Sequence, residues 1–362
     1  MNPNTLFPSL HLIGSHQMGG AEQCCFRLVQ ALHEEGHPTN IVLRPDSPLM
    51  PVFREVQIEP LPMAYANVWD VWSLWHIRRL IAKIQPAIVQ SYLGRATRLT
   101  RVPQASGSVH VARLDGFYKI DGFRHAQAWV GVSRKLCDYL VGSGLPADRV
   151  FHIGHFVPPP SVPSPEEREA LRIRHAIPET AWVLFALGRF VEKKGFQELL
   201  AAFAALPETV AGRPVHLMIA GDGPIRESLH EQARQSNANA RVHWLGWQNA
   251  PGHYFALADV FVCPSRHEPL GVVQLEAWNY RLPMVTTANE GASELVTDQD
   301  NALICPIADA KTMAETLLIM LNMPESERRA MGERGQALLQ RRYSREVILG
   351  EYLDLYGRLT GI

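Results

Sequence analysis

Short apolar runs alternate with helix-patterned segments along this chain, and the alternation occurs twice. The first series opens with a strand pattern at Leu10–Ile13, a loop containing two glycines, and a helical pattern over Ala21–Glu35. The second series opens with a strand pattern at Val183–Ala186 and a helical pattern over Phe196–Leu206. Apolar strands separated by helices are typical of parallel sheets that helices cover on both faces. The sequence therefore predicts an α/β fold with two doubly wound, Rossmann-like domains.

A proline-rich segment separates the two series. Residues 157–164 read VPPPSVPS, and the fixed φ angle and missing N–H of proline exclude a regular helix or a central strand there. We interpret this segment as the linker between an N-terminal domain over residues 1–160 and a C-terminal domain over residues 161–343. A break at Arg341–Ser344 precedes the last helical pattern. That helix, in residues 344–362, can pack back on the N-terminal domain.

Composition narrows the class of protein. With 362 residues, 46% of them hydrophobic and 20% charged, the chain is long enough for two domain cores. A formal net charge of -1 argues against a dedicated nucleic-acid binder, which needs a basic surface. Five scattered cysteines without CxxC spacing fit a reducing cytoplasm. We find no leader-like N-terminus and no run of about 18 to 20 apolar residues, so membrane contact is expected to be peripheral at most.

The first candidate site follows the opening strand of the second domain. Gly188 and Arg189 come directly after that strand, and Lys194 stands just before the next helix. Glycine allows a close backbone approach, and the two cations would lie near a helix N-terminus, which favours anions. This pattern indicates a diphosphate site, although a solvated βα turn explains the spacing equally well.

The second candidate site lies in the stretch CPSRHEPLGVVQLEAW. Glu268 is in a loop after an apolar strand, and Glu276 is inside the helix that follows, in apolar surroundings where an unpaired carboxylate would be costly to bury. Between them, Pro269, Leu270 and Gly271 open the helix, where backbone N–H groups can hold a phosphate or a sugar hydroxyl. We expect one glutamate to bind a sugar and the other a nucleoside ribose.

Together these segments resemble a known family. The residues GRFVEKKG, IAGDGP, LADVFVCPSRHEPLGVVQLEAW and the final helix, in this order, are similar to the retaining GT-B glycosyltransferases of family 4, also called group 1. The resemblance covers nearly the whole chain and implies two Rossmann-like domains that face each other across a cleft. Within the family, it is closest in kind to bacterial enzymes of lipopolysaccharide and other envelope glycans.

The resemblance implies roles for particular residues. Arg189 and Lys194 match the cations that hold the donor diphosphate, Glu276 matches the glutamate on the ribose hydroxyls, and Glu268 matches the carboxylate facing the donor sugar. Residues that match the family's donor-binding backbone are Gly188, Pro269, Leu270 and Gly271. Gly19 and Gly20 match the N-domain glycine pair whose backbone lies beside the diphosphate and the acceptor. Taken without the family, that glycine pair would simply indicate a tight turn.

One position departs from the family. Where many relatives carry a histidine after an N-domain strand, this chain reads VARLDGFY, with Asp115 at about that point. Asp115 is a candidate for the polar role near the reacting sugar, and a turn residue before glycine is the alternative. A second motif, Asp298-Gln299-Asp300, looks like a metal-binding DxD sequence, but we interpret it as a turn because such GT-B enzymes generally need no metal. No cofactor or metal is therefore expected.

The implied activity is transfer of a hexose, with retention, from a nucleotide-sugar to a glycan or lipid-linked acceptor. UDP is the expected base, with GDP as the alternative. Two rival functions stay open: an epimerase or phosphorylase on the same fold, and a non-catalytic nucleotide-sugar-binding subunit. One helix pattern fits contact with an anionic membrane surface, or a core stripe with a solvated face; its aromatic and basic residues are Trp69, Trp72, Trp75, Arg78, Arg79 and Lys83.

Overall fold

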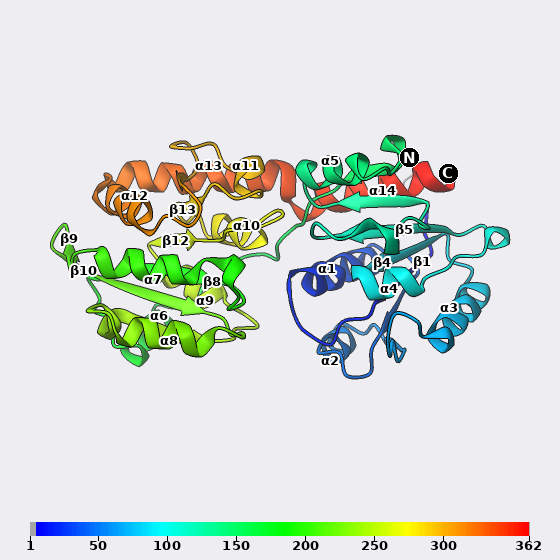
Figure 1. Cartoon of the computed structure of the whole chain (residues 1–362), viewed down its shortest axis with the longest axis horizontal. Coiled ribbons are helices and arrows are strands. Elements are labelled where there is room, and N and C mark those ends of the chain that lie inside the picture. Colours follow the sequence, from blue (N-terminus) through cyan, green and yellow to red (C-terminus); the bar gives the residue numbers. More distant parts are fainter. Residues whose placement is uncertain (1–4, 362) are drawn as a thin grey trace. The chain divides into compact units, whose positions relative to one another are not determined.

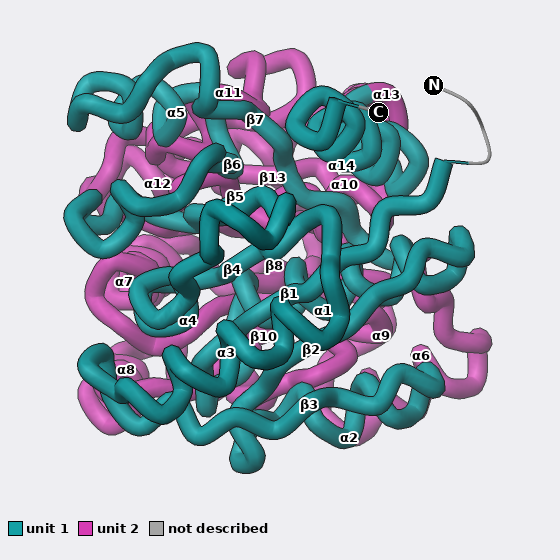
Figure 2. Tube along the Cα trace, turned by 90° about the vertical axis from the view of Figure 1, so that its right-hand side faces the viewer, with its two compact units in different colours: residues 1–158, 342–362 teal, residues 159–341 magenta. Residues whose placement is uncertain are grey.

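The computed structural model describes residues 5–361, and the chain divides into two compact units. Unit 1 consists of two segments, one that ends at Pro158 and one that begins at Arg342, and unit 2 is Pro159–Arg341 (Figure 2). The last helix therefore belongs to unit 1. Among the described residues, no helix is both long and apolar enough to cross a lipid bilayer.

Unit 1 is built on a seven-stranded parallel sheet with strand order β3-β2-β1-β4-β5-β6-β7. Its strands are β1 (Ser9–Ile13), β2 (Thr39–Leu43), β3 (Leu61–Pro62), β4 (Ile88–Tyr92), β5 (Val109–Leu114), β6 (Ala128–Gly131) and β7 (Val150–His152). Its α-helices are α1 (Gly20–Glu34), α2 (Leu49–Glu55), α3 (Val71–Ile84), α4 (Leu93–Leu99), α5 (Arg134–Gly142) and α14 (Arg345–Thr360) (Figure 1). The order reverses between β1 and β4, as in a doubly wound fold.

Both faces of this sheet are buried because successive residues of a strand point to opposite sides. Leu10 and Leu12 of β1 pack in one apolar cluster with Ile77 of α3, while Ile13 packs in another with Phe53 of α2. Strand β1 has only buried residues, and its two polar side chains, Ser9 and His11, lie 3.1 Å apart and form a hydrogen bond with each other. The predicted doubly wound arrangement of this half is confirmed.

Unit 2 repeats the plan with the strand order β11-β10-β8-β12-β13-β14, and the short β9 pairs with β10. Its strands are β8 (Trp182–Leu187), β9 (Thr209–Val210), β10 (Arg213–Ala220), β11 (Val242–Gly246), β12 (Val260–Cys263), β13 (Met284–Thr287) and β14 (Leu303–Cys305). Its α-helices are α6 (Pro165–Arg174), α7 (Phe196–Ala205), α8 (Arg226–Arg234), α9 (Gly252–Leu257), α10 (Val272–Asn279), α11 (Ala292–Leu295), α12 (Ala310–Asn322) and most of α13 (Glu325–Tyr343). Neighbouring strands in the order from β11 to β14 all pair in parallel.

The ends of two helices differ from the sequence expectation. A break was expected over Arg341–Ser344, but α13 continues to Tyr343 and only Ser344 interrupts the helical backbone. Ser344 ends the interruption by capping α14, because its hydroxyl accepts a hydrogen bond from the N–H of Val347. The proline-rich segment is free of helix and strand, as expected, and α6 starts after it with a capping box of Ser164 and Glu167.

Candidate active site

The predicted cations of unit 2 lie where its strand order reverses. Strands β8 and β12 are neighbours, yet the chain leaves β8 toward β10 and reaches β12 only later. Gly188 and Arg189 follow β8, and Glu268 follows β12, so all three are at the carboxyl edge of adjacent parallel strands. In open α/β sheets this edge is the usual place for a ligand.

Lys194 and Glu268 form an ion pair at this edge. They are 74 residues apart in sequence, and both side chains are largely buried. Burial lowers the pKa of Lys194, but the Glu268 carboxylate outweighs this effect and the pKa lies above its ordinary value. Lys194 is therefore a permanent cation. The residue predicted to bind the diphosphate, Lys194, is in direct contact with the residue predicted to face the sugar, Glu268.

Gly195 explains how these two loops come so close. Its φ of +68° is left-handed, and a Cβ atom there would lie 1.9 Å from the carbonyl oxygen of Pro264, in the loop after β12. The N–H groups of Arg266 and His267 donate to the carbonyl of Lys193 at 2.8 and 3.2 Å. The turn before α7 is therefore held against the loop that carries Glu268.

Arg189 differs from Lys194 in its surroundings. Its side chain is exposed and has no hydrogen bond or ion pair within residues 5–361. Gly188 is half-buried, and its N–H donates to the carbonyl of Ala220 at 3.0 Å. One predicted cation is thus neutralised by a carboxylate, and the other faces solvent at the end of β8.

The segment between the two glutamates begins α10 as predicted. Gly271 occupies the N-cap with a left-handed φ of +88°, and Leu270 is buried. Pro269 has no N–H, so only the residues after it can donate from the backbone. No side chain of residues 5–361 caps this helix, and the first N–H groups of α10, before Gln274, are therefore available to an anion.

Glu290 is a member of this site that the sequence analysis missed. Its carboxylate accepts the N–H of Glu268 at 3.0 Å and pairs with Nδ1 of His267 at 3.0 Å. The N–H of Gly291 then donates to the carbonyl of Glu268 at 2.7 Å. The loop after β13 thereby fixes the backbone of Glu268, which no local sequence signal indicated.

Glu276 is half-buried on α10 rather than fully enclosed. Burial raises the pKa of Tyr280, one turn further along, and the charge of Glu276 adds to that rise. The hydroxyl of Tyr280 accepts the N–H of Ser161 at 2.8 Å, in the proline-rich segment. Glu276 therefore stands on the helix that anchors the start of unit 2.

In unit 1 the glycine pair joins β1 to α1. Gly19 is the N-cap of α1 with an extended φ of -158°, so its backbone does not require glycine. A Cβ atom at Gly19 would, however, lie 2.9 Å from a carboxylate oxygen of Glu22, whereas Gly20 has open space. Burial raises the pKa of Glu22, and the nearby Asp115 adds to the rise. Glu22 was not anticipated from the sequence.

Asp115 belongs to a buried polar cluster at the carboxyl end of β5. Its carboxylate lies 3.3 Å from Nε of Arg113 and 3.1 Å from Nε2 of His155. Burial raises the pKa of Asp115, but Arg113 and His155 together lower it below its ordinary value. Asp115 is therefore an ionised, paired carboxylate. Asp115 also lies in a bend directly before Gly116, as the turn-residue alternative expects.

Cys24 completes this cluster, since ligand atoms of Cys24, Asp115 and His155 all lie within 4.8 Å of one another. Such a set can in principle hold a metal ion. The fully buried Arg113 already places its permanent charge on Asp115, and that charge would repel a second cation. The DxD-like residues also have protein partners: Asp298 accepts the N–H of Ile304 at 2.9 Å, and Asp300 pairs with Arg334 at 2.8 Å.

Solved structures define the class of this protein. HepE of Anabaena, in complex with UDP and glucose, superposes with a TM-score of 0.83 at 18% identity, covering 97% of this chain and all of HepE. The lipopolysaccharide outer core galactosyltransferase WaaB, in its apo form, gives a TM-score of 0.72 at 14% identity, covering 97% of this chain and 99% of WaaB. At these identities the likeness establishes the fold, which is GT-B.

Sequence comparison then gives the family. Residues 167–338 match the description "Glycosyl transferases group 1", and residues 18–159 match "Glycosyltransferase Family 4". The lipopolysaccharide core biosynthesis glycosyltransferase LpsE of Rhizobium meliloti is 30% identical over 93% of this chain and 95% of its own length. LpsD of the same organism is 28% identical, with 94% and 95% covered. This chain belongs to the group 1 glycosyltransferases.

Proposed function

We propose that the chain is a retaining hexosyltransferase that uses a UDP-sugar, with a GDP-sugar as the alternative, and acts on a glycan or lipid-linked acceptor of the bacterial envelope. The observation that carries this proposal is the Lys194–Glu268 pair beside the exposed Arg189 at the carboxyl edge of β8 and β12. The UDP bound to HepE supports the base, and the printed roles of LpsE and LpsD support lipopolysaccharide synthesis.

In this proposal the leaving diphosphate is stabilised by Arg189 and Lys194 and by N–H groups at the start of α10. Arg189, Lys194 released from Glu268 by the diphosphate, and helix N–H groups would supply the positive potential that a metal ion provides in other transferases, and we propose that no metal takes part. Glu268 would hold the donor sugar beside Lys194, and Glu276 would accept hydrogen bonds from the ribose hydroxyls. Retention would follow if the departing phosphate receives the acceptor proton on the same face.

The acceptor is assigned to the carboxyl edge of the unit 1 sheet, where Gly19 and Asp115 lie. Because the pKa of Asp115 is lowered, its carboxylate is ionised at neutral pH and can accept, but not donate, a hydrogen bond from a sugar hydroxyl. The five free cysteines among the described residues favour a reducing, cytoplasmic location.

The first test is a thermal-shift screen with UDP, GDP and ADP and their sugar conjugates, on the wild type, Lys194→Ala, Glu276→Ala and the control Lys193→Ala. Lys193 is the exposed neighbour of Lys194. A ligand that binds the folded state raises its apparent stability. Stabilisation by one nucleotide in the wild type and the control, lost in the other two variants, supports the donor site. Loss in all variants or in none contradicts it.

Product analysis with that donor separates the rival functions. A glycosylated product whose anomeric configuration, measured by NMR, equals that of the donor supports retaining transfer. An inverted product overturns the retaining assignment. Conversion of the donor sugar without an acceptor indicates an epimerase, and dependence on phosphate indicates a phosphorylase. Donor binding without turnover across an acceptor screen indicates a binding subunit.

A further inference from the structure

Unit 1 exposes a group of large apolar side chains at the start of α3. Trp69 is 79% exposed and Trp72 is 72% exposed, and Val71 and Trp75 are exposed beside them. We call these four residues the tryptophan face. Single exposed apolar residues are ordinary, but three tryptophans within seven positions make a contiguous patch, and such patches mark interaction sites.

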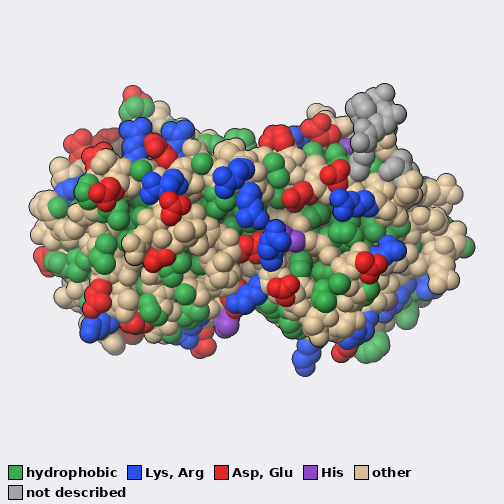
Figure 3. Space-filling view, turned by 90° about the horizontal axis from the view of Figure 1, so that it is seen from above, with side chains coloured by type: hydrophobic (Ala, Val, Ile, Leu, Met, Phe, Trp, Pro, Cys, Tyr) green, Lys and Arg blue, Asp and Glu red, His purple; other side chains and the backbone are tan. Residues whose placement is uncertain are grey.

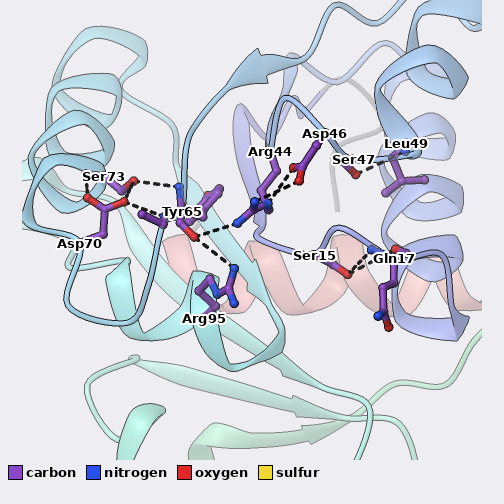
Figure 4. A network of polar contacts seen from close by, with 11 residues as sticks. Ser15, Gln17, Arg44, Asp46, Ser47, Leu49, Tyr65, Asp70, Ser73 and Arg95 are labelled. Carbon is purple, nitrogen blue, oxygen red and sulfur yellow. Dashed lines mark hydrogen bonds and ion pairs between the residues drawn. The ribbon is translucent and has the colours of Figure 1, made fainter. Parts of the chain in front are cut away.

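Side-chain hydrogen bonds tie down the loop that leads into the tryptophan face. Asp70 caps α3 through the N–H of Ser73 at 3.0 Å and also accepts the Ser73 hydroxyl at 2.6 Å (Figure 4). The Ser73 hydroxyl accepts the N–H of Tyr65 at 3.2 Å, and the carbonyl of Tyr65 accepts from Arg44 and Arg95 at 3.1 Å each. These hydrogen bonds join the loop before α3 to Arg44 and Arg95, and Trp69 and Trp72 are exposed on either side of the Asp70 cap.

Cations surround the tryptophan face. Arg78, Arg79 and Lys83 continue along α3 as exposed residues, and the Arg79 guanidinium lies 4.7 Å from the centre of the Trp75 ring. The basic and acidic side chains on the view in Figure 3 are interspersed, in keeping with a net charge of -1. The run of cations beside exposed tryptophans on α3 therefore differs from the mixed charges of the face drawn in Figure 3.

A cavity of about 390 Å³ opens between this face and the segment after α4. Trp69 and Leu74 line it together with Arg98 and Arg101. Nη1 of Arg101 is buried and has no hydrogen-bond partner within the described chain. Burial lowers the pKa of Arg101, and the charges of Arg98 and Arg78 lower it further.

Two carboxylates also line the cavity. Asp70 accepts the bonds that cap α3, and the Asp121 side chain is 85% exposed, with its carboxylate 3.7 Å from Nε of Arg124. A buried guanidinium nitrogen without a partner is costly unless an anion reaches it. The cavity therefore offers Arg98 and Arg101 to an anionic group that enters beside Trp69.

We infer that the tryptophan face docks on an anionic phospholipid surface, with Trp69 and Trp72 in the interfacial layer and a lipid phosphate in the cavity with Arg98 and Arg101. Tryptophan favours the membrane interface because its ring is apolar and its N–H is polar. Clustered Lys and Arg side chains are attracted to the negative surface potential of anionic lipids. A bilayer supplies both kinds of partner side by side, which a purely apolar protein surface does not.

This inference goes beyond the proposed function and does not depend on the donor site. It is tested by sedimentation of the full chain with vesicles of phosphatidylcholine alone and of phosphatidylcholine mixed equally with phosphatidylglycerol. We expect binding to the mixed vesicles, reduced about tenfold or more in Trp69→Ala/Trp72→Ala. The matched control, Val162→Ala/Ile173→Ala, removes two exposed apolar residues of unit 2 and should bind like the wild type. Equal binding by both double variants, or no vesicle binding by the wild type, overturns the inference.

The proposed phosphate site in the cavity is tested by a separate pair of substitutions. Arg98→Gln/Arg101→Gln should lose the preference for anionic over neutral vesicles while the protein stays folded. If this variant keeps the preference for anionic vesicles but loses a thermal stabilisation that inorganic phosphate gives the wild type beyond a sodium chloride control of equal ionic strength, the cavity binds a free anion and the lipid-phosphate part of the inference is wrong. Brominated phosphatidylcholine should quench wild-type tryptophan fluorescence, and binding without quenching would indicate a protein-like contact instead.

Folding and donor binding provide the last check on these variants. Each should keep the wild-type melting temperature and the nucleotide-induced shift, because Trp69, Trp72, Arg98 and Arg101 lie outside the proposed donor site. A failed nucleotide screen with intact vesicle binding would refute the proposed function alone. Intact nucleotide binding with no effect of the tryptophan substitutions on vesicles would refute the membrane inference alone.

Discussion

The hydroxyl of Tyr356, on the last helix, donates a hydrogen bond of 2.7 Å to Oε1 of Gln90, in the middle of strand β4. Both side chains are buried, and 266 residues separate them. The Gln90 amide continues the chain of contacts by donating to the hydroxyl of Tyr92 at 2.8 Å. The C-terminal helix is therefore part of the interior of unit 1, joined to its central strands by polar as well as apolar contacts.

This relationship predicts that Tyr356→Phe is destabilising. The change removes one hydroxyl and leaves Oε1 of Gln90 buried without a donor, which should lower the free energy of unfolding by about 1–3 kcal/mol. Tyr65→Phe is the matched control, because the Tyr65 hydroxyl is equally buried in unit 1 and has no hydrogen-bond partner among the described residues. Urea denaturation should show the control unchanged or more stable. Equal losses in both variants would contradict the role of the bond.

The buried cluster around Asp115 predicts a pH dependence through His155. Burial lowers the pKa of His155, and the charge of Arg113 lowers it too. Cys24 and Asp115 raise this pKa by more, so it lies above the ordinary value of 6.5. A raised folded pKa means that the stabilisation is fully present below pH 6.5 and is lost as the pH rises through the folded value. The stability difference between the wild type and His155→Gln should therefore shrink on the alkaline side, as measured by urea denaturation across the pH range.

The stability contribution of Asp115 depends on pH with the opposite sign, so Asp115 serves as a control. Its folded pKa lies below the ordinary 3.8, so its contribution is present above pH 3.8 and disappears as the pH falls through the folded value. The difference between the wild type and Asp115→Asn should shrink in acid, where the carboxylate is protonated, and, because Asp115 also raises the pKa of His155, it should shrink again where His155 loses its proton. A His155→Gln difference that does not vary with pH would show that the imidazole is not charged in the folded protein.

Much of the fold was predictable because buried strands and amphipathic helices leave local patterns. The strands expected at Leu10–Ile13 and Val183–Ala186 and the helices expected over Ala21–Glu35 and Phe196–Leu206 all form, and their ends lie within one residue of the expected bounds. Helix α12, in contrast, was not predicted. Its sequence AKTMAETLLIMLN has a helical apolar stripe, and its N-cap Asp309 accepts the N–H of Thr312, so the signal was present.

The site was predictable only in part. Family motifs identified Lys194 and Glu268 separately, but nothing local to either residue indicates that they pair across 74 positions. The contacts of Asp115 with Arg113 and His155 depend in the same way on where three different segments meet. Glu22 and Glu290 were missed because an acidic residue near a loop carries no sequence signal until its neighbours in space are known.

The close approach at Gly195 predicts a large effect for a small substitution. Gly195→Ala places a methyl group 1.9 Å from the Pro264 carbonyl oxygen at a left-handed φ of +68°. Gly246→Ala is the matched control, since its φ is +66° but no atom lies within 4 Å. The control should lose only about 1–2 kcal/mol from backbone strain. Gly195→Ala should lose clearly more, and with it the nucleotide-induced thermal shift, because the two loops must separate.

The Lys194–Glu268 pair predicts that substitution of Glu268 affects UDP binding and sugar transfer differently. If Lys194 holds the diphosphate, Glu268 competes for the same cation, so Glu268→Gln should bind UDP as tightly as the wild type or several-fold more tightly. The same variant loses the carboxylate proposed to face the donor sugar, and its kcat should fall by about 100-fold or more. Lys194→Ala should weaken UDP binding and slow transfer together, while Lys193→Ala should do neither. Calorimetric UDP titration and a transfer assay measure the two quantities. Weaker UDP binding in Glu268→Gln would mean that the carboxylate positions Lys194 rather than competing with the diphosphate, and the assigned roles of the pair would then be wrong.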